Sequence, residues 1–261
     1  MNINCQCGAG QEHLAQFFAN GETDFRLCGV CGCVFRERFP SPSELDQIYR
    51  QAYGNENIGA VNTNQESGDH ATLNYARHLL REVLHPGDRL LDYGAGTGAL
   101  LHELRKFGVR GDGLEFSENA RSYCLAERGF ALRSNLRDVP DGYFNVISMI
   151  EVIEHLTDLP GTLKEVHRVL APGGQIFVTT PCRTGLRARL ERGFWREAQK
   201  KFHLFLFDWR SINFHLQRAG FLDVRRKVFS PLQKPGWKFW VYSRITQSIG
   251  LSGTLCVLAR K

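Results

Sequence analysis

The stretch that most constrains this chain is a short apolar run at 90–93, followed by three alternating glycines and then helical periodicity through residue 104. Gly94, Gly96 and Gly98 permit backbone conformations that are closed to other residues, and they let a ligand approach without meeting a Cβ atom. The helix that follows points its N-terminal amides at whatever lies over the turn. Dinucleotide-binding proteins, phosphate-binding loops and plain tight turns all use such glycines, so the turn alone predicts strand, turn and helix but no particular ligand.

A carboxylate at the end of the next predicted strand narrows the choice of ligand. The strand covers 109–115 and ends in Glu115, 17 residues after Gly98. A carboxylate at that place can accept hydrogen bonds from both hydroxyls of a ribose. No Lys-Ser or Lys-Thr pair closes the glycine turn, which argues against a phosphate-binding P-loop.

From Asp88 onward, strand-like and helix-like segments alternate, which predicts an α/β fold with a parallel sheet and helices on both faces. An amphipathic helix predicted over 71–84 leads into the first strand. The segment 182–207 lies between the fifth strand and a helix predicted over 208–219. It is too long for an ordinary connection, and we expect it to form a cap over the ligand site.

Asp92 and the G-x-G-x-G turn together resemble the first motif of the class I S-adenosylmethionine-dependent methyltransferases. Two later motifs are similar to motifs of the same family: E-V-I-E-H-L at 151–156, after the predicted fourth strand, and R-V-L-A-P-G-G at 168–174, before the predicted fifth. Asn145 departs from the family, whose members usually carry aspartate there, and this affects only a local turn contact. The resemblance covers roughly residues 70–261.

The resemblance implies a seven-stranded, mostly parallel sheet with helices on both faces. Its sixth strand would cover 221–228, and an antiparallel seventh strand would cover 254–259. The predicted domains are a zinc-ribbon-like segment (1–40), a linker with a short helix (41–70) and a methyltransferase domain (71–261) that contains the cap at 182–207.

The resemblance also implies S-adenosylmethionine as the cofactor. Asp92 would orient the glycine turn and the methionine end, Glu115 would hold the ribose, and Asn135 would lie at the adenine edge. For each of these residues, an ordinary turn-capping or core role is the alternative. The predicted cofactor-binding residues are Asp92, Tyr93, Gly94, Ala95, Gly96, Gly98, Glu115, Phe116, Asn135, Leu136, Ile150 and Glu151.

Three residues near the predicted ligand edge are candidates for catalysis. His155 is the first candidate for a general base, since imidazole titrates near neutral pH and can accept a proton from an attacking hydroxyl. Glu154 precedes it, and His203 falls where relatives often have H-x-x-x-F. Methyl transfer is an in-line displacement, so positioning without a base is one alternative, and a structural histidine is another.

Five of the eight cysteines fall within the first 33 residues. Two close pairs about twenty residues apart are typical of a structural zinc ribbon in a reducing compartment. The predicted metal ligands are Cys5, Cys7, Cys28 and Cys31. Cys33 or His13 is an alternative for one of the four, and a small core or redox-active thiols would be a different explanation. The stretch 26–35 resembles the ribbon that precedes many bacterial glycan and small-molecule methyltransferases.

The formal net charge of +6 is unevenly distributed. Residues 182–201 carry seven basic and two acidic side chains, and 224–261 carry eight basic and no acidic ones. Both segments adjoin the carboxyl edge of the predicted sheet, so a basic rim there favours an anionic substrate. A solvated basic face is the alternative. Aromatic residues lie among the cations around Trp237, a mixture suited to a membrane surface or to stacking, although core packing of a long hairpin is the favoured explanation.

The sequence contains no apolar run as long as a membrane span and no basic-then-apolar leader at Met1, from which we expect a cytoplasmic protein. The predicted function is methyl transfer from S-adenosylmethionine to an oxygen or nitrogen of a small anionic acceptor, such as a nucleotide-linked sugar, glycan or lipid intermediate. An RNA methyltransferase is the runner-up, although no RNA-binding motif is evident. A non-catalytic, cofactor-binding scaffold is a third hypothesis.

Overall fold

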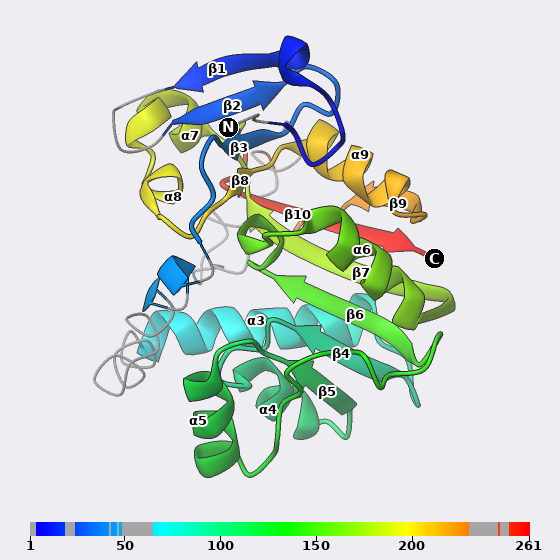
Figure 1. The fold of residues 1–261 in the computed structure, drawn as a ribbon. Helices are drawn as coiled ribbons and strands as arrows, with labels where there is room; N and C mark the ends of the chain where they lie inside the picture. Colours follow the sequence, from blue (N-terminus) through cyan, green and yellow to red (C-terminus); the bar gives the residue numbers. More distant parts are fainter. Residues whose placement is uncertain are drawn as a thin grey trace.

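The computed structural model describes residues 4–18, 24–41, 43–45, 47–48, 65–229, 245 and 251–261, with the backbone alone for 65–70. The described residues form two sheets (Figure 1). A small antiparallel sheet lies at one end of the molecule, and a larger α/β unit makes up the rest.

The larger sheet has six strands in the order β5-β4-β6-β7-β10-β9. In chain order these are β4 (Arg89–Tyr93), β5 (Arg110–Leu114), β6 (Phe144–Ile150), β7 (Leu170–Pro181), β9 (Leu222–Arg226) and β10 (Thr254–Arg260). The first four are parallel, whereas β10 runs antiparallel to both of its neighbours, β7 and β9. The predicted antiparallel strand over 254–259 is thereby confirmed.

Helices cover both faces of this sheet, as predicted (Figure 1). One face packs against α3 (Gln65–Glu82), α4 (Ala99–Arg105) and α5 (Glu118–Arg128), and the other against α6 (Leu159–Val169) and α9 (Trp209–Arg218). Successive strand residues alternate between the two cores: Leu90 joins the first and Leu91 the second, and Phe177 and Val178 do the same in β7. The near-continuous apolar strands follow from burial on both sides.

The described residues form six strands of this sheet, so the predicted count of seven is not confirmed. Beside β5, where a further strand would pair, there is a single parallel bridge between Leu114 and Arg133. Two backbone hydrogen bonds hold it: the Arg133 amide donates to the Gly113 carbonyl at 2.8 Å, and the Glu115 amide donates to the Arg133 carbonyl at 2.9 Å. Polar Ser134 and Asn135 follow immediately, and the described residues show no further pairing with β5 beyond this bridge.

The small sheet has the order β1-β2-β3-β8, with β1 (Leu14–Phe18), β2 (Phe25–Cys28), β3 (Val34–Arg36) and β8 (Phe205–Leu206) all antiparallel. Its last strand comes from the segment predicted to be a cap. The rest of that segment folds into α7 (Leu186–Glu191), η3 (Arg192–Phe194) and α8 (Arg196–Gln199). Ala188, Trp195 and Ala198 pack against Phe25 and Val34 of the sheet. The segment is thus largely a part of the N-terminal unit.

The N-terminal unit also packs directly on the larger one. The buried cysteines belong to the same hydrophobic cluster as the inner faces of α6 and α9. The Gln6 side chain donates to the Thr157 carbonyl at 2.6 Å and accepts from the Leu159 amide at 2.8 Å, at the start of α6. The two units are therefore in direct contact, and the predicted boundary at residue 40 stays a prediction.

The predicted linker lies mostly outside the described residues, as do the aromatic and basic residues around Trp237. Helical residues are described at 43–45 and 47–48, within the predicted short helix. The helix predicted over 71–84 is confirmed as α3, which begins six residues earlier, at Gln65. None of the helices in the described ranges is both long and apolar enough to cross a bilayer.

Candidate functional site

The glycine turn between β4 and α4 requires glycine at each of its three positions. Gly94, Gly96 and Gly98 have φ values of 80°, 52° and 76°, a region that side chains with a Cβ disfavour. A Cβ on Gly94 would lie 2.4 Å from a methyl carbon of Val152, and one on Gly98 would lie 2.5 Å from the sulfur of Cys124. Residues with a Cβ are therefore disfavoured at all three positions by the backbone conformation, and at Gly94 and Gly98 also by close packing.

Glu115 lies at the end of β5 and is joined to the glycine turn. Its Oε2 accepts a hydrogen bond from the Gly96 amide at 2.8 Å, and its Oε1 accepts one from the Ser117 amide at 2.8 Å. The side chain is largely buried, with 8% exposed. These two amides hold the carboxylate beside the turn, and its contact with ribose hydroxyls stays a prediction.

Asp92, at the end of β4, is buried on the other side of the turn. It accepts a hydrogen bond from the Ser148 hydroxyl at 2.8 Å. Desolvation raises the pKa of Asp92 to about 6, and the nearby Glu115 charge adds to the shift. A buried carboxylate of this kind is well suited to a cationic partner, because a positive charge offsets the cost of its ionisation.

Two cavities lie on either side of the turn and share Gly94. The smaller, of about 250 Å³, is lined by Ala71, Thr72, Tyr75, Asp92, Gly94, Ala95, Gly96, Thr97, Ala99, Leu100 and Ile150. The larger, of about 390 Å³, is lined by Leu45, Tyr93, Gly94, Glu115, Phe116, Glu151, Val152, His155, Leu156, Thr157, Asp158, Thr162 and Phe202. Nine of the twelve predicted cofactor-binding residues line one cavity or the other.

The remaining three lie elsewhere. Gly98 is the N-terminal cap of α4, behind the turn. Leu136 is buried in the core and its carbonyl accepts from Arg168, while the exposed Asn135 side chain accepts from the Arg137 amide at 3.0 Å. The adenine contacts assigned to Asn135 and Leu136 stay predictions.

Glu151, directly after β6, faces the larger cavity with a backbone φ of 55°. Its Oε1 accepts from the Thr179 hydroxyl at 3.1 Å, and the hydroxyls of Thr179 and Tyr75 are 3.3 Å apart. The carboxylate is open to solvent through the cavity, yet the surrounding protein desolvates it and raises its pKa, with repulsion from Glu154 adding to the effect. The positive φ of a non-glycine residue here is typical of a functional turn.

The three predicted catalytic residues are brought together by the fold. Glu154 and His155 lie in η2 (Ile153–His155), and His203 immediately precedes Leu204, whose amide donates to the Glu154 carbonyl at 2.8 Å. The rings of His155 and His203 have centroids 4.8 Å apart. Of these three, His155 alone lines a described cavity. Its Nδ1 pairs with the Phe202 carbonyl at 2.9 Å, and the Glu151 backbone also contacts the ring.

Glu154 and His203 are buried behind His155. The Glu154 side chain is 1% exposed, and its Oε2 accepts from the Thr180 hydroxyl at 3.0 Å. Desolvation raises the pKa of Glu154. Burial, together with the neighbouring His155, Lys200 and Arg36, lowers the pKa of His203 to about 2, so its ring is neutral.

Several cavity residues were not predicted from the sequence. Phe202 comes from the segment 182–207, Leu45 from the predicted linker, and Thr162 from α6. Asp158 also lines the cavity, where it caps α6 by accepting from the Gly161 amide at 2.9 Å. The Asp-Leu-Pro sequence at 158–160 is a recognisable helix start, but nothing local to it indicates a ligand site.

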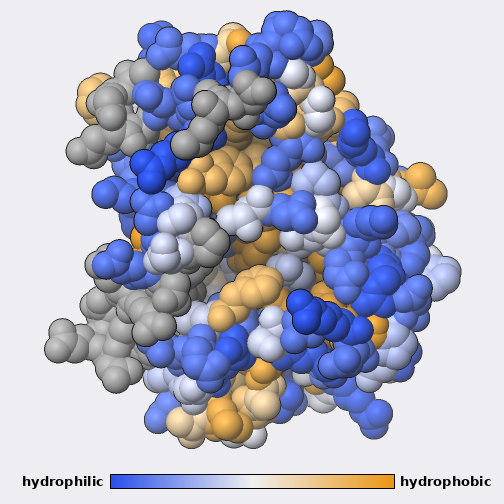
Figure 2. Space-filling view, in the orientation of Figure 1, coloured by the Kyte–Doolittle hydropathy of each residue, from blue (hydrophilic) through white to orange (hydrophobic). Residues whose placement is uncertain are grey.

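None of the basic residues of 182–201 lines either of these two cavities. Lys200 nevertheless lies 6.0 Å from the ring of Phe202, and Lys201 lines a separate cavity together with Arg36 and Arg38. Arg183 contacts Asp208 and the Gly32 carbonyl, and Arg187 pairs with Glu191 at 2.9 Å. Arg189 donates to the Thr184 carbonyl at 2.7 Å. Figure 2 shows hydrophobic groups gathered in the middle of the visible face, with hydrophilic groups around them. The recruitment of an acceptor by this rim stays a prediction.

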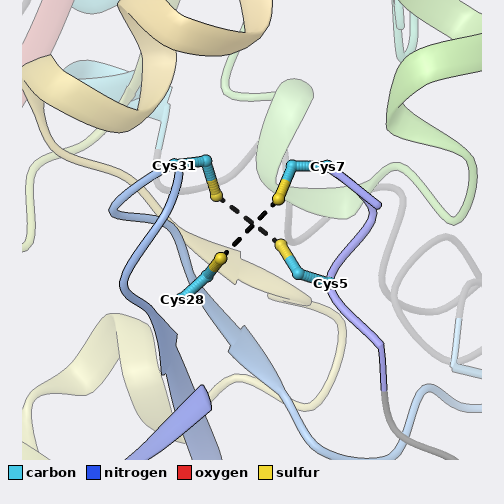
Figure 3. Close-up of side chains that lie close together, drawn as sticks. All are labelled: Cys5, Cys7, Cys28 and Cys31. Carbon is cyan, nitrogen blue, oxygen red and sulfur yellow. Dashed lines mark hydrogen bonds between the residues drawn. The ribbon is translucent and has the colours of Figure 1, made fainter. Parts of the chain in front are cut away.

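The four predicted metal ligands converge in the N-terminal unit (Figure 3). All four sulfur atoms lie within 4.8 Å of one another, with the Cys5–Cys31 and Cys7–Cys28 pairs each at 3.6 Å. All four side chains are at most 4% exposed. Cys33 and His13, the alternative ligands, are outside this group, and the Cys33 sulfur instead faces the Val34 carbonyl at 3.7 Å.

The chain belongs to a family described as a methyltransferase domain, whose model matches residues 68–225. Among curated proteins it is 30% identical over 151 residues to phosphoethanolamine N-methyltransferase 1 of Arabidopsis thaliana, covering 54% of this chain and 30% of that protein. It is also 30% identical over 104 residues to a ubiquinone biosynthesis O-methyltransferase of Pseudomonas aeruginosa, covering 36% of this chain and 44% of the relative. The match thus spans less than half the length of these relatives.

Among solved structures, phosphoethanolamine N-methyltransferase 2 of Haemonchus contortus in complex with S-adenosyl-L-methionine shares the fold. The TM-score is 0.62 at 18% identity, with 87% of this chain and 61% of that one covered. The methyltransferase of Haloferax volcanii in complex with the Trm112 activator has a TM-score of 0.60 at 19% identity and covers 81% of this chain and 96% of that one. At such identities the likeness establishes the class I methyltransferase fold.

Proposed function

We propose that this chain binds S-adenosylmethionine and transfers its methyl group to an oxygen or nitrogen of a small anionic acceptor. The observation that carries the proposal is the contact between the Glu115 carboxylate and the Gly96 amide, at a turn flanked by two cavities. Glu115 would accept the ribose hydroxyls. The smaller cavity, with buried Asp92, suits the cationic methionine end.

The acceptor would occupy the larger cavity beyond Glu115, toward His155. In the transfer step the acceptor atom forms a bond to the methyl carbon as the carbon–sulfur bond breaks, and the electron pair stays on sulfur. Alignment of these three atoms supplies much of the rate, and the acceptor proton leaves to water or to a carboxylate or imidazole in the cavity wall. Phe202 and Leu156 would exclude water from the reacting atoms.

Two of the relatives are named for small-molecule chemistry, on phosphoethanolamine and in ubiquinone biosynthesis. Phosphoethanolamine is itself anionic, which supports a small anionic acceptor. Within that class we favour a nucleotide-linked sugar, glycan or lipid intermediate. The cavity of about 390 Å³ has room for a compact group of this kind.

We also infer that Cys5, Cys7, Cys28 and Cys31 hold one structural zinc ion. A regular tetrahedron of thiolates around zinc, with bonds of about 2.3 Å, has sulfur–sulfur edges of about 3.8 Å. The two 3.6 Å pairs fit that figure closely. Four cysteines fill the coordination shell and leave no open position, so the ion would stabilise the fold without entering the chemistry.

A methyl-transfer screen with labelled cofactor tests the main proposal. The acceptors are phosphoethanolamine, nucleotide sugars, lipid-linked glycans, quinone precursors and total RNA. We expect label in a small anionic acceptor. Label in RNA alone would contradict the proposed acceptor class, and cofactor binding without transfer to any acceptor would favour a scaffold.

A further inference from the structure

The cluster formed by Glu154, His155 and His203 contains buried polar atoms that no protein group satisfies. Glu154 Oε1 and His203 Nδ1 are both fully buried and have no hydrogen-bond partner. Such atoms are costly in a folded protein, since each forfeits its hydrogen bonds to water. A group absent from the protein chain is the simplest way to satisfy them.

Hydrogen bonds within the cluster do not satisfy these two atoms. Glu154 Oε1 lies 3.9 Å from His155 Nε2, too far for a hydrogen bond. His203 Nδ1 is 3.7 Å from Glu197 Oε2, and that carboxylate is already paired with the Lys200 amine at 2.5 Å. The three residues nevertheless offer one ligand atom each, and these atoms all lie within 4.8 Å of one another.

The distances between the ligand atoms fit coordination of a metal ion better than a hydrogen bond. Ligands at about 2.1 Å from an octahedral ion are about 3.0 Å apart when adjacent and about 4.2 Å apart when opposite. The 3.9 Å separation and the 4.8 Å limit lie close to this range, so small side-chain movements would complete the coordination. A metal ion would also offset the repulsion between the carboxylates of Glu154 and Glu151.

The surrounding hydrogen bonds orient the ligand atoms. The Phe202 carbonyl fixes His155 Nδ1 at 2.9 Å and leaves Nε2 for the metal, and the Thr180 hydroxyl holds Glu154 Oε2 and leaves Oε1. Arg36 donates to the His203 carbonyl at 2.9 Å and fixes that backbone. Outer partners of this kind are characteristic of metal ligands.

We propose that Glu154, His155 and His203 bind a divalent first-row transition-metal ion whose open coordination positions face the larger cavity, where an oxygen atom of the acceptor completes its shell. Two imidazoles and one carboxylate suit such an ion and leave several positions free. His155 and Glu151 line the cavity, which places those positions on the acceptor side. With the ion bound, His155 acts as a ligand and not as a general base. The acceptor contact rests on the proposed function, whereas the metal site does not.

Metal titration of the full chain, with its cysteines loaded with zinc beforehand, tests the site without cofactor or acceptor. Calorimetry with Mn²⁺ and with Co²⁺ should show one ion bound per chain for at least one of the two metals. Glu154→Gln, His155→Gln and His203→Gln should each weaken binding by tenfold or more, since even the loss of an outer partner costs about 10–100-fold. His102→Gln on α4 is the matched control and should bind as the wild type does.

Absence of binding for both metals, or equal affinity in the three variants and the control, would overturn the site. Because a variant at a buried residue can fail to fold, the fold of each variant is checked by circular dichroism. If Glu154→Gln unfolds, the partly exposed His155→Gln variant is used to test the site. The acceptor contact has its own readout: added metal should lower the acceptor Michaelis constant in the wild type and not in His203→Gln. Methyl transfer that proceeds equally well without metal would overturn the acceptor contact and leave the metal site standing.

Discussion

The cysteine cluster and the Glu154, His155 and His203 cluster differ in how completely the protein surrounds them. The four sulfur atoms face one another, are all buried, and would fill the shell of one ion. The second cluster has three unlike ligands, and His155 opens onto a cavity. A closed set of like ligands is suited to holding the chain together, and an open, mixed set is suited to meeting a small molecule.

The largest expected effect comes from breaking the closed cluster. Cys28→Ser should lose the zinc ion and lower the Tm by about 10 °C or more, since structural zinc contributes several kcal/mol and each kcal/mol corresponds to about 2–4 °C in a domain of this size. Metal analysis and thermal unfolding measure both. The matched control is Cys33→Ser, a buried neighbour outside the cluster, which should keep its zinc. A metal-free wild-type protein with every thiol titratable would refute the zinc site.

Asp92 should make stability depend on pH. Its pKa is about 6 in the folded protein and about 3.9 when unfolded, so the folded state binds the proton more tightly. The resulting stability is fully present below about pH 4 and is lost as the pH rises through 6, an effect of about 3 kcal/mol at most. Asp92→Asn should remove this slope in urea unfolding between pH 4 and 7. The control Asp88→Asn, just before the other end of β4, should keep this pH dependence of stability. An unchanged pH dependence in Asp92→Asn would show that another group causes it.

Replacing Glu115 should weaken cofactor binding and leave metal binding at the two side-chain clusters unchanged. Glu115→Ala removes a charged acceptor worth about 1.5–3 kcal/mol, or roughly tenfold to more than a hundredfold in the Kd for S-adenosylmethionine. Calorimetric titration measures it. Glu118→Ala, a nearby exposed residue that pairs with Arg121, serves as the control. Equal Kd values in both variants would mean that another group holds the ribose.

The smallest effect is expected from the basic rim. Arg187 pairs with Glu191 in its own helix, and Arg189 donates to the Thr184 carbonyl just before that helix. Both lie outside the described cavity linings, so they can act on an anionic acceptor only over a distance. Reversing both to Glu should raise the acceptor Michaelis constant modestly and leave cofactor affinity nearly intact. The effect should fade with salt, because exposed charges are screened over about 8–10 Å. Arg110→Glu, at the opposite edge of the sheet, is the control. If the acceptor Michaelis constant does not depend on salt in either variant, the basic residues of 182–201 form only a solvent-exposed face with no role in recruiting the acceptor.

The sequence by itself determined the glycine turn and the elements on either side of it. The three glycines and the flanking apolar runs act within a few residues, which is why β4, α4 and β5 match their predicted ranges closely. The four cysteines were also identified from their spacing, because one ion would require all four side chains to meet. The bridge beside β5 shows the limit of such patterns, since two hydrogen bonds are too few for a strand.

Only the tertiary structure decided how distant segments combine. The residues at 182–207 supply β8 to the N-terminal sheet, Phe202 to the cavity and His203 to the side-chain cluster. No local pattern specifies this, because the strand contains two residues and is held by pairing with β3 and by burial against the core. Likewise, the two unsatisfied atoms of Glu154 and His203 arise from burial between elements almost fifty residues apart, which residue spacing does not encode.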